Sequence, residues 1–208
     1  MDERDSTMRL AALQGEISLC RKCVSAGHLT DANPVFRGHA GQRAMVIGQA
    51  PSVRAHLQGV PWSGASGDLL RSWFAQAGFA PEQFLDDWYF TSLTRCFPGK
   101  AASGNGDRAP SRTELALCRP WLDAEIALVQ PRLMVTLGRM AADAIIPGAR
   151  GQTLRDLVGT IQPVDLGYGL IPVVPLPHPS GVGRWLNDPS NRALVNTAMA
   201  ALAKEIST

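Results

Sequence analysis

Residues 44–52 read AMVIGQAPS, in which a short apolar run is followed by a loop that contains glycine and proline. An apolar run of this length, bounded by such a loop, indicates a strand with both faces buried. Similar runs occur at 88–93, 133–137 and 171–176, and helical stretches separate them. Because this alternation is typical of a parallel sheet covered by helices, the sequence predicts the α/β class. We expect three α/β/α layers around a central, mainly parallel, four-stranded sheet, with one strand from each run.

Helices are expected between these strands. The sequence SRTE at 111–114 is a capping box, in which the serine and glutamate side chains bond the free amides of a first helical turn. The helix that it opens should stop near Pro131. Other helices are expected up to about Ile17, over 67–77 and over 191–206.

Length and composition set limits on the class of protein. A chain of 208 residues can bury one substantial core, and we expect a single domain over 1–208. No apolar run approaches the roughly 20 residues needed to cross a bilayer, so we expect no contact with membranes. The first residues, MDERD, are not an apolar signal segment, which favours the cytoplasm over secretion. The net charge of +2 does not by itself indicate nucleic-acid binding, so any DNA-binding charge must be clustered.

The four cysteines are the most informative residues of the chain. Cys20 and Cys23 form a C-x2-C pair, and Cys96 and Cys118 each stand two residues before a proline. A C-x2-C pair suits zinc, a redox disulfide or one edge of an iron–sulfur cluster. Zinc ribbons usually supply two such pairs, so a cluster gathered from separate loops fits this spacing better. Zinc and unconnected buried thiols are the alternatives.

Two loops that follow strands are suited to holding a ligand, because open α/β sheets bind ligands at the carboxyl ends of their strands. In the first, Gly48 allows a ligand close to the backbone, and the amides after it can donate to an anion or a carbonyl. In the second, Pro177 and Pro179 stiffen the backbone around His178, whose imidazole can donate to an oxygen that gains charge. The alternative for each loop is a tight turn, with His178 bonded to a backbone carbonyl.

Together these motifs resemble the uracil-DNA glycosylase superfamily, and within it the iron–sulfur members of family four. The resemblance covers most of the chain. Its segments are GQAP at 48–51, GVPWSGASGDLL at 59–70, YFTSLTRC at 89–96, CRPWL at 118–122, VTLG at 135–138 and HPS at 178–180. The first two segments follow the family pattern G-E-A-P-G and G-x-P-F-V-G-x-A-G-x-L-L without a gap, so the match is specific.

The resemblance implies a monofunctional DNA repair enzyme that flips uracil out of DNA, hydrolyses its N-glycosidic bond and leaves an abasic site. It implies that Trp62 stacks on uracil, unless it is a core tryptophan, that Ser92 reads the amide edge, and that His178 donates to O2 as negative charge develops. The other residues expected to bind the base are Gly48, Ala50, Pro51 and Ser180. The ligands implied for a four-iron four-sulfur cluster are Cys20, Cys23, Cys96 and Cys118.

Three positions depart from family four. Gln49 stands where the family has a glutamate, and a glutamine can orient water but cannot act as a general base. His56 stands where the family usually has an acidic pair, and it is either a substitute base or a surface histidine. Ser92 stands at an asparagine position, where a hydroxyl reaches less far than an amide. Two alternatives follow: a non-catalytic iron–sulfur protein that binds damaged DNA, and a glycosylase that also accepts deaminated purines.

Contacts with DNA are expected from three basic residues. The segment 100–108, KAASGNGDR, cannot join a core, so we expect a mobile surface loop, in which Lys100 and Arg108 touch phosphate or remain solvated. A relative of family four traps DNA covalently through a histidine in this region, and since 100–109 contains none, we expect turnover. Arg184 is the expected wedge into the duplex, or a phosphate contact. We expect a monomer that acts on uracil-containing DNA, single- or double-stranded, in the cytoplasm at the nucleoid.

Overall fold

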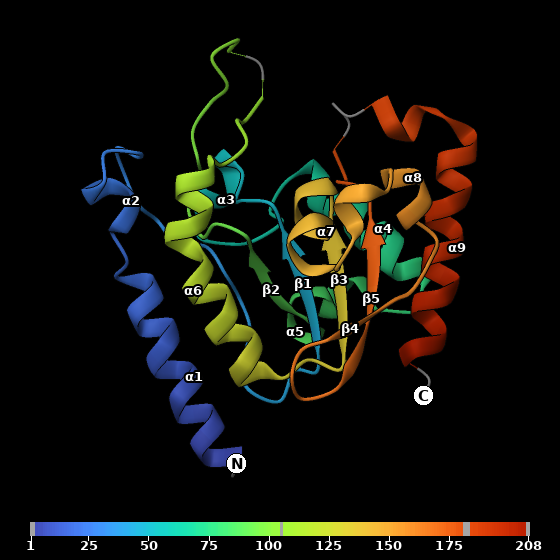
Figure 1. Cartoon of the computed structure of the whole chain (residues 1–208), viewed down its shortest axis with the longest axis horizontal. Coiled ribbons are helices and arrows are strands. Elements are labelled where there is room, and N and C mark those ends of the chain that lie inside the picture. Colours follow the sequence, from blue (N-terminus) through green and yellow to red (C-terminus); the bar gives the residue numbers. More distant parts are fainter. Residues whose placement is uncertain (1–2, 105, 181–183, 207–208) are drawn as a thin grey trace.

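The centre of the fold is a five-stranded sheet with the strand order β2-β1-β3-β5-β4 (Figure 1). The computed structural model describes residues 3–104, 106–180 and 184–206. The strands β2, β1, β3 and β5 are parallel, and β4 runs antiparallel to β5. The α/β class and a mainly parallel sheet are therefore confirmed. The strands are β1 Ala44–Gly48, β2 Tyr89–Ser92, β3 Leu133–Leu137, β4 Gln162–Asp165 and β5 Leu170–Leu176.

The sheet has five strands, so the prediction of four was wrong. The additional strand is β4, which lies at the edge and pairs with β5 in a register that places Pro163 opposite Pro172. Only Val164 of this strand is buried. Proline cannot donate to a strand ladder, so a proline weakens the strand pattern of a segment of only four residues. A short edge strand that contains proline and a single buried residue therefore escapes a search for continuous apolar runs.

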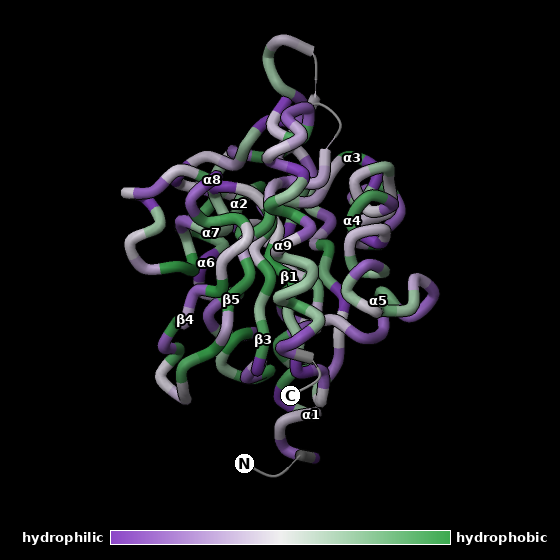
Figure 2. Tube along the Cα trace, turned by 90° about the vertical axis from the view of Figure 1, so that its right-hand side faces the viewer, coloured by the Kyte–Doolittle hydropathy of each residue, from purple (hydrophilic) through white to green (hydrophobic). Residues whose placement is uncertain are grey.

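Helices cover both faces of the sheet, as the alternation of runs predicted. Helices α1 Glu3–Ser18, α6 Arg112–Val129 and α7 Arg139–Ile145 pack on one face, and α4 Ala65–Gln76 and α9 Pro189–Ile206 pack on the other (Figures 1 and 2). Within the described ranges, no helix has the length and apolar character needed to span a membrane. The shorter helices are α2 Lys22–Ser25, α3 Val53–Gln58, α5 Phe84–Asp87, α8 Leu154–Leu157, and the 3₁₀ helices η1 Pro81–Gln83, η2 Ala149–Gly151 and η3 Arg184–Asn187.

Strand β1 is buried on both sides, which explains why its sequence is continuously apolar. Met45 and Ile47 belong to the core that contains residues of α1, α6 and α7. Val46 belongs to the core on the opposite face, with residues of α4 and α9. Successive side chains of a strand point to opposite faces, so both faces of a central strand between two helical layers are buried and require apolar residues.

Helix α6 begins at the predicted capping box, and farther along it a buried carboxylate joins it to the sheet. The Glu125 side chain has no exposed surface and accepts hydrogen bonds from Tyr89 Oη at 3.0 Å and from Thr91 Oγ1 at 2.7 Å. The buried guanidinium of Arg95 forms an ion pair with the same carboxylate. A buried charge is costly unless it is paired and hydrogen-bonded, and here both conditions are met. Glu125 therefore fixes α6 against β2 and the residues that follow it.

The Glu125→Ala variant should lose about 3–5 kcal/mol of unfolding free energy, because Arg95 would remain charged in the core without its partner. Asp123→Ala is the matched control on the same helix, since Asp123 is half exposed and pairs with Arg119 one turn away. An exposed pair of this kind contributes less than about 1 kcal/mol. Urea unfolding followed by tryptophan fluorescence measures both variants. Equal losses would contradict the structural role of Glu125.

Candidate active site

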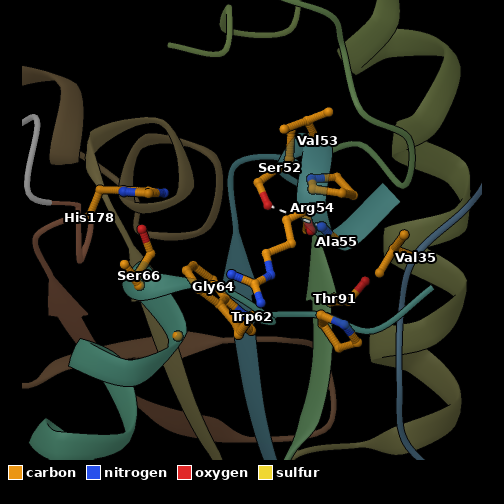
Figure 3. Close-up of a pocket in the computed structure, with 16 residues that line it drawn as sticks. Val35, Ser52, Val53, Arg54, Ala55, Trp62, Gly64, Ser66, Thr91 and His178 are labelled. Carbon is orange, nitrogen blue, oxygen red and sulfur yellow. Dashed lines mark hydrogen bonds between the residues drawn. The ribbon is translucent and has the colours of Figure 1, made fainter. Parts of the chain in front are cut away.

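A pocket opens at the carboxyl ends of β1 and β2, beside the chain that leaves β5 (Figure 3). Its volume is about 280 Å³. Trp62, Ser92 and His178 lie far apart in the sequence but line this pocket together, with Ala50 and Pro51 from the loop after β1. The structure therefore brings the main residues singled out from the sequence into one cavity, at the sheet edge where ligands bind in α/β proteins.

The loop after β1 is held in place by neighbouring backbone. The carbonyl of Gln49 accepts from the Thr94 amide at 3.3 Å, which extends the pairing of β1 and β2 beyond their ends. Ser52 then caps α3, because its hydroxyl accepts from the Ala55 amide at 3.2 Å. The chain thus passes from β1 into α3 within a few residues, and both sides of this turn contribute to the pocket lining.

Trp62 is fitted tightly into the pocket wall. Its φ is 56°, in the left-handed region that non-glycine residues seldom adopt. A Cβ atom on Gly48 would lie 3.1 Å from Trp62 Cζ2, so the glycine leaves room for the indole. A Cβ atom on Gly67 would lie 1.7 Å from the Trp62 carbonyl oxygen, which no rearrangement of a side chain could relieve. The two glycines therefore set the position of the Trp62 ring and backbone.

His178 faces Trp62 across the pocket, with 5.9 Å between the ring centroids. Gly138, at φ 85°, makes room for it, because a Cβ atom there would lie 3.3 Å from His178 Cβ. The His178 carbonyl accepts from the Ser180 amide at 2.8 Å, which closes the tight turn. The imidazole is open to the pocket, but the surrounding protein displaces enough water to lower its pKa. His178 is therefore neutral near pH 7, with one N–H available as a donor.

A groove of about 570 Å³ adjoins the pocket. Gln49 and Ser180 line this groove and not the pocket, and His178 lines both. On its other side lies the segment around Lys100 and Arg108. Most of the predicted substrate-binding and DNA-binding residues thus line an inner cavity, an outer groove or both, while Gly48 and Arg184 line neither.

Lys100 and Arg108 both have acidic partners. The ammonium of Lys100 lies 2.8 Å from Asp107 Oδ1. The guanidinium of Arg108 donates to both carboxylate oxygens of Glu114, at 2.6 and 2.7 Å. This contact holds the pKa of Glu114 down at about 2. The described part of the predicted surface loop is tied down by these contacts, so either cation would have to exchange its partner to contact a phosphate.

His56 and Arg184 lie elsewhere. His56 does not line the pocket, and its Nε2 atom is 3.4 Å from Asp31 Oδ2. Its ring packs 5.9 Å from that of Phe97. Arg184, the expected wedge, begins η3 and is exposed, and residues 181–183 before it lie outside the described residues.

The four cysteines line a second pocket. Cys23 lies on α2 and Cys118 on α6, while Cys20 and Cys96 lie on the chain between elements. Two N–H groups point at sulfur, from the Arg95 amide to Cys118 Sγ at 3.3 Å and from the Trp121 indole to Cys20 Sγ at 3.4 Å. All four are free thiols, and the described residues contain no group of three ligands suited to a single metal ion.

Burial raises the pKa of the Cys23 thiol to about 11 and that of Cys96 to about 12, with a further increase from the neighbouring thiols. Thr94 lines the same pocket, and its buried hydroxyl has no hydrogen-bond partner in the part of the chain that the structure describes. Converging thiols, N–H donors aimed at sulfur and an unused hydroxyl form a donor set that fits an iron–sulfur cluster.

Arg54 and Thr91 line the pocket but were missed in the sequence analysis. Thr91 is the residue before Ser92 and was visible only as part of a strand. Arg54 lies in α3, which follows the GQAPS loop directly, so its nearness to the loop was the one signal available. Glu125 was missed because a glutamate on a helix is usually solvated.

Comparison with known proteins gives the family. The family model described as the uracil DNA glycosylase superfamily matches residues 36–203. The Type-4 uracil-DNA glycosylase of Archaeoglobus fulgidus is 30% identical over 171 residues, which cover 80% of this chain and 79% of that protein. The enzyme of the same name from Pyrobaculum aerophilum is 29% identical over 154 residues, 73% of each chain. That of Thermotoga maritima is 28% identical over 162 residues, 77% of each chain.

Gly67→Ala should disrupt the pocket, because the added methyl group would overlap the Trp62 carbonyl oxygen. We expect a loss of about 1–3 kcal/mol or more of stability, as for other overpacked sites. Gly15→Ala in α1 is the control, since a Cβ atom there meets nothing within 4 Å and alanine favours the helix. Thermal unfolding compares the two. A melting temperature for Gly67→Ala equal to that of the unmodified protein would contradict this account of the Trp62 turn.

Proposed function

Because the chain belongs to the uracil DNA glycosylase superfamily, we propose that it is a monofunctional uracil-DNA glycosylase of base excision repair. It hydrolyses the N-glycosidic bond of uracil in DNA and leaves an abasic site without cutting the strand. The pocket shared by Trp62, Ser92 and His178 is the observation that supports this function best, since the segments that contain these residues carry the resemblance to family four. The names of the relatives from three organisms agree with it.

The base must leave the duplex to react, since the glycosidic bond of a stacked base is inaccessible. A strand lying in the outer groove would present its flipped nucleotide to the pocket, because the two cavities share the lining residues Ala50, Pro51, Ser52, Ser66 and His178. Lys100, Arg108 and Arg184 are the cations that we propose for phosphate contacts. Each would neutralise a phosphate of the DNA backbone and would not distinguish one base from another.

In the bond-breaking step, the electron pair of the N-glycosidic bond moves to the base. The sugar becomes an oxocarbenium ion, and the base becomes an anion with charge on N1 and O2. Trp62 holds the face of the base, Ser92 bonds its edge, and the neutral imidazole of His178 donates its N–H to O2. A donor that meets charge only as it develops lowers the barrier, and losing one typically costs about 2.7–4 kcal/mol.

Water completes the reaction at the sugar. It attacks C1′, and one of its protons passes to solvent, while the departed base takes up a proton from solvent. Gln49 lines the groove beside His178 and orients this water through its side-chain amide. An amide cannot remove the proton, so bond breaking precedes water attack. His56 lies outside the described lining of both cavities, and Asp31 lies beside it, so Gln49 is the better-placed residue for this step.

Cys20, Cys23, Cys96 and Cys118 are the residues that would hold a four-iron four-sulfur cluster. When bound, the cluster supplies a covalent crosslink between segments that are remote in the sequence. The Arg95 amide and the Trp121 indole point at Cys118 Sγ and Cys20 Sγ and would donate to these sulfurs in a bound cluster. The role of the cluster would be architectural. It would tie the other cysteine segments to Cys118 on α6, the helix that Glu125 fixes to the sheet.

Protein purified without oxygen should be brown, absorb broadly near 400 nm and contain about four irons and four sulfides per chain, as four cysteine ligands imply. Cys118→Ala should lose iron and solubility together, since metal binding and folding are coupled. Iron and labile sulfide are measured by colorimetric assay. Stoichiometric zinc without labile sulfide would exclude the cluster while leaving the glycosylase proposal open to its own test.

His178→Ala should slow single-turnover uracil excision at least about a hundredfold, as expected for a lost donor to developing charge, with little loss of DNA affinity. His39→Ala, an exposed histidine that lines neither cavity, is the control. The assay uses oligonucleotides that contain uracil, hypoxanthine or thymine. Alkali cleaves the strand at each abasic site, and the cleaved fraction measures excision. Absence of uracil excision by the unmodified protein would refute the proposed function, and a normal rate for His178→Ala would remove this residue from the mechanism.

The pH profile adds a check on the state of His178. Desolvation lowers its pKa below the ordinary value of 6.5, so the neutral donor persists as the pH falls through 6.5. The excision rate should therefore stay constant down to this pH and decline only below it. A rate that rises as the imidazole becomes protonated would contradict the neutral donor.

A further inference from the structure

Arg54 is the charged residue of the pocket that the mechanism above does not use. Its side chain reaches from α3 across the cavity, and the guanidinium points toward Trp62 and Gly64 (Figure 3). The side-chain stem runs past Gly64, where a Cβ atom would lie 3.5 Å from Arg54 Cδ. Within the described residues the guanidinium has neither a hydrogen bond nor an ion pair, unlike those of Arg95 and Arg108. The cation is therefore free to bind a ligand.

The rest of the pocket favours negative charge. Its described lining contains no carboxylate, and His178, the other titratable residue, is neutral near pH 7. The first turn of α4 also faces the cavity through Ala65 and Ser66, and its N-cap, Gly64, has no side chain to occupy the free amides. Free amides at a helix start carry partial positive charge. A permanent cation and these dipoles thus act on whatever occupies the pocket.

We propose that Arg54 is a catalytic residue that stabilises the anionic base as it leaves the sugar. This inference rests on the proposed glycosylase function. When the glycosidic electron pair moves to the base, the negative charge spreads from N1 over the carbonyl oxygens, and the guanidinium donates N–H groups to one of them. No proton is transferred, because a guanidinium remains protonated at all relevant pH values. The interaction strengthens as charge develops on the base, so it lowers the barrier to bond breaking.

The substitution at Gln49 makes this charge more important. A carboxylate at that position would attract the sugar cation and repel the departing anion. A neutral amide does neither. The charged and dipolar groups of the described lining that we assign to the anion are His178, Arg54 and the start of α4, and each favours negative charge. In this chain, stabilisation of the transition state therefore acts mainly on the departing base.

The competing role for Arg54 is a contact with DNA phosphate. A phosphate contact weakens binding to the same extent whatever the base is. A contact with the leaving group matters more when the departing base is a stronger base and needs more stabilisation. Uracil and 5-fluorouracil differ in this respect, because fluorine makes the ring more acidic and the anion a better leaving group, while the shape changes little.

The test is single-turnover excision of uracil and of 5-fluorouracil by Arg54→Gln and Arg54→Lys. Arg54→Gln should slow uracil excision about a hundredfold, the scale of one lost donor, and 5-fluorouracil excision about tenfold or less. Arg54→Lys, which keeps the charge, should recover part of the loss. Arg132→Gln is the control, because Arg132 is exposed before β3, at the opposite end of the sheet. Equal losses for the two bases, together with weaker DNA binding, would assign Arg54 to phosphate and overturn the proposal.

A binding measurement separates this inference from the glycosylase function itself. Calorimetric titration of free 5-fluorouracil into the protein with abasic-site DNA, at pH values on both sides of the ring ionisation, compares the anion with the neutral base. The unmodified protein should bind the anion more tightly, and Arg54→Gln should lose this preference. Equal affinity for the two forms would overturn the proposal. This result does not depend on turnover, so it decides the role of Arg54 even if no uracil is excised.

Discussion

The buried carboxylate of Glu125 is the contact on which the rest of the structure depends. It lies without exposed surface between α6 and β2, and hydroxyls from the strand and the guanidinium of Arg95 satisfy it. Arg95 also donates to the Ser92 carbonyl and, through its backbone amide, to Cys118 Sγ. One network therefore positions a residue of the base pocket and a residue of the cysteine pocket. A carboxylate in the core has no favourable alternative to these partners, so the two pockets keep a fixed relation.

The base pocket separates two kinds of charge. Around the base, His178, Arg54 and the start of α4 favour negative charge, and the described lining has no acid to oppose them. In the adjoining groove Gln49 offers a neutral amide to water. In the mechanism that we propose, this site lowers the barrier by stabilising the anion of the departing base and does not need to activate the nucleophile strongly. We propose that such a site can function with Gln49 at the position where the family has a glutamate.

Much of this arrangement could be predicted from particular residues. The continuous apolar run of β1 indicated a strand between two helical layers, and the motifs around Trp62 and His178 indicated a pocket at the carboxyl ends of the strands. Strand β4 could not be found in this way, because it is four residues long, contains a proline and buries only Val164. The direction of side chains on α3 was also beyond reach. Successive residues of a helix are about 100° apart, so His56, two residues after Arg54, points to the opposite side. The sequence analysis considered His56 as a catalytic base, whereas in the structure Arg54 lines the pocket and His56 does not.

The most direct measurement is an experimental structure of the protein bound to DNA that contains 2′-fluoro-2′-deoxyuridine, in which the electronegative fluorine slows formation of the oxocarbenium ion. The account predicts that the uracil ring is out of the duplex and against Trp62, with O2 within hydrogen-bond distance of the His178 imidazole and the strand lying in the groove beside Gln49. A uracil that stays stacked in the duplex, or DNA bound on another face while the pocket remains closed, would contradict it.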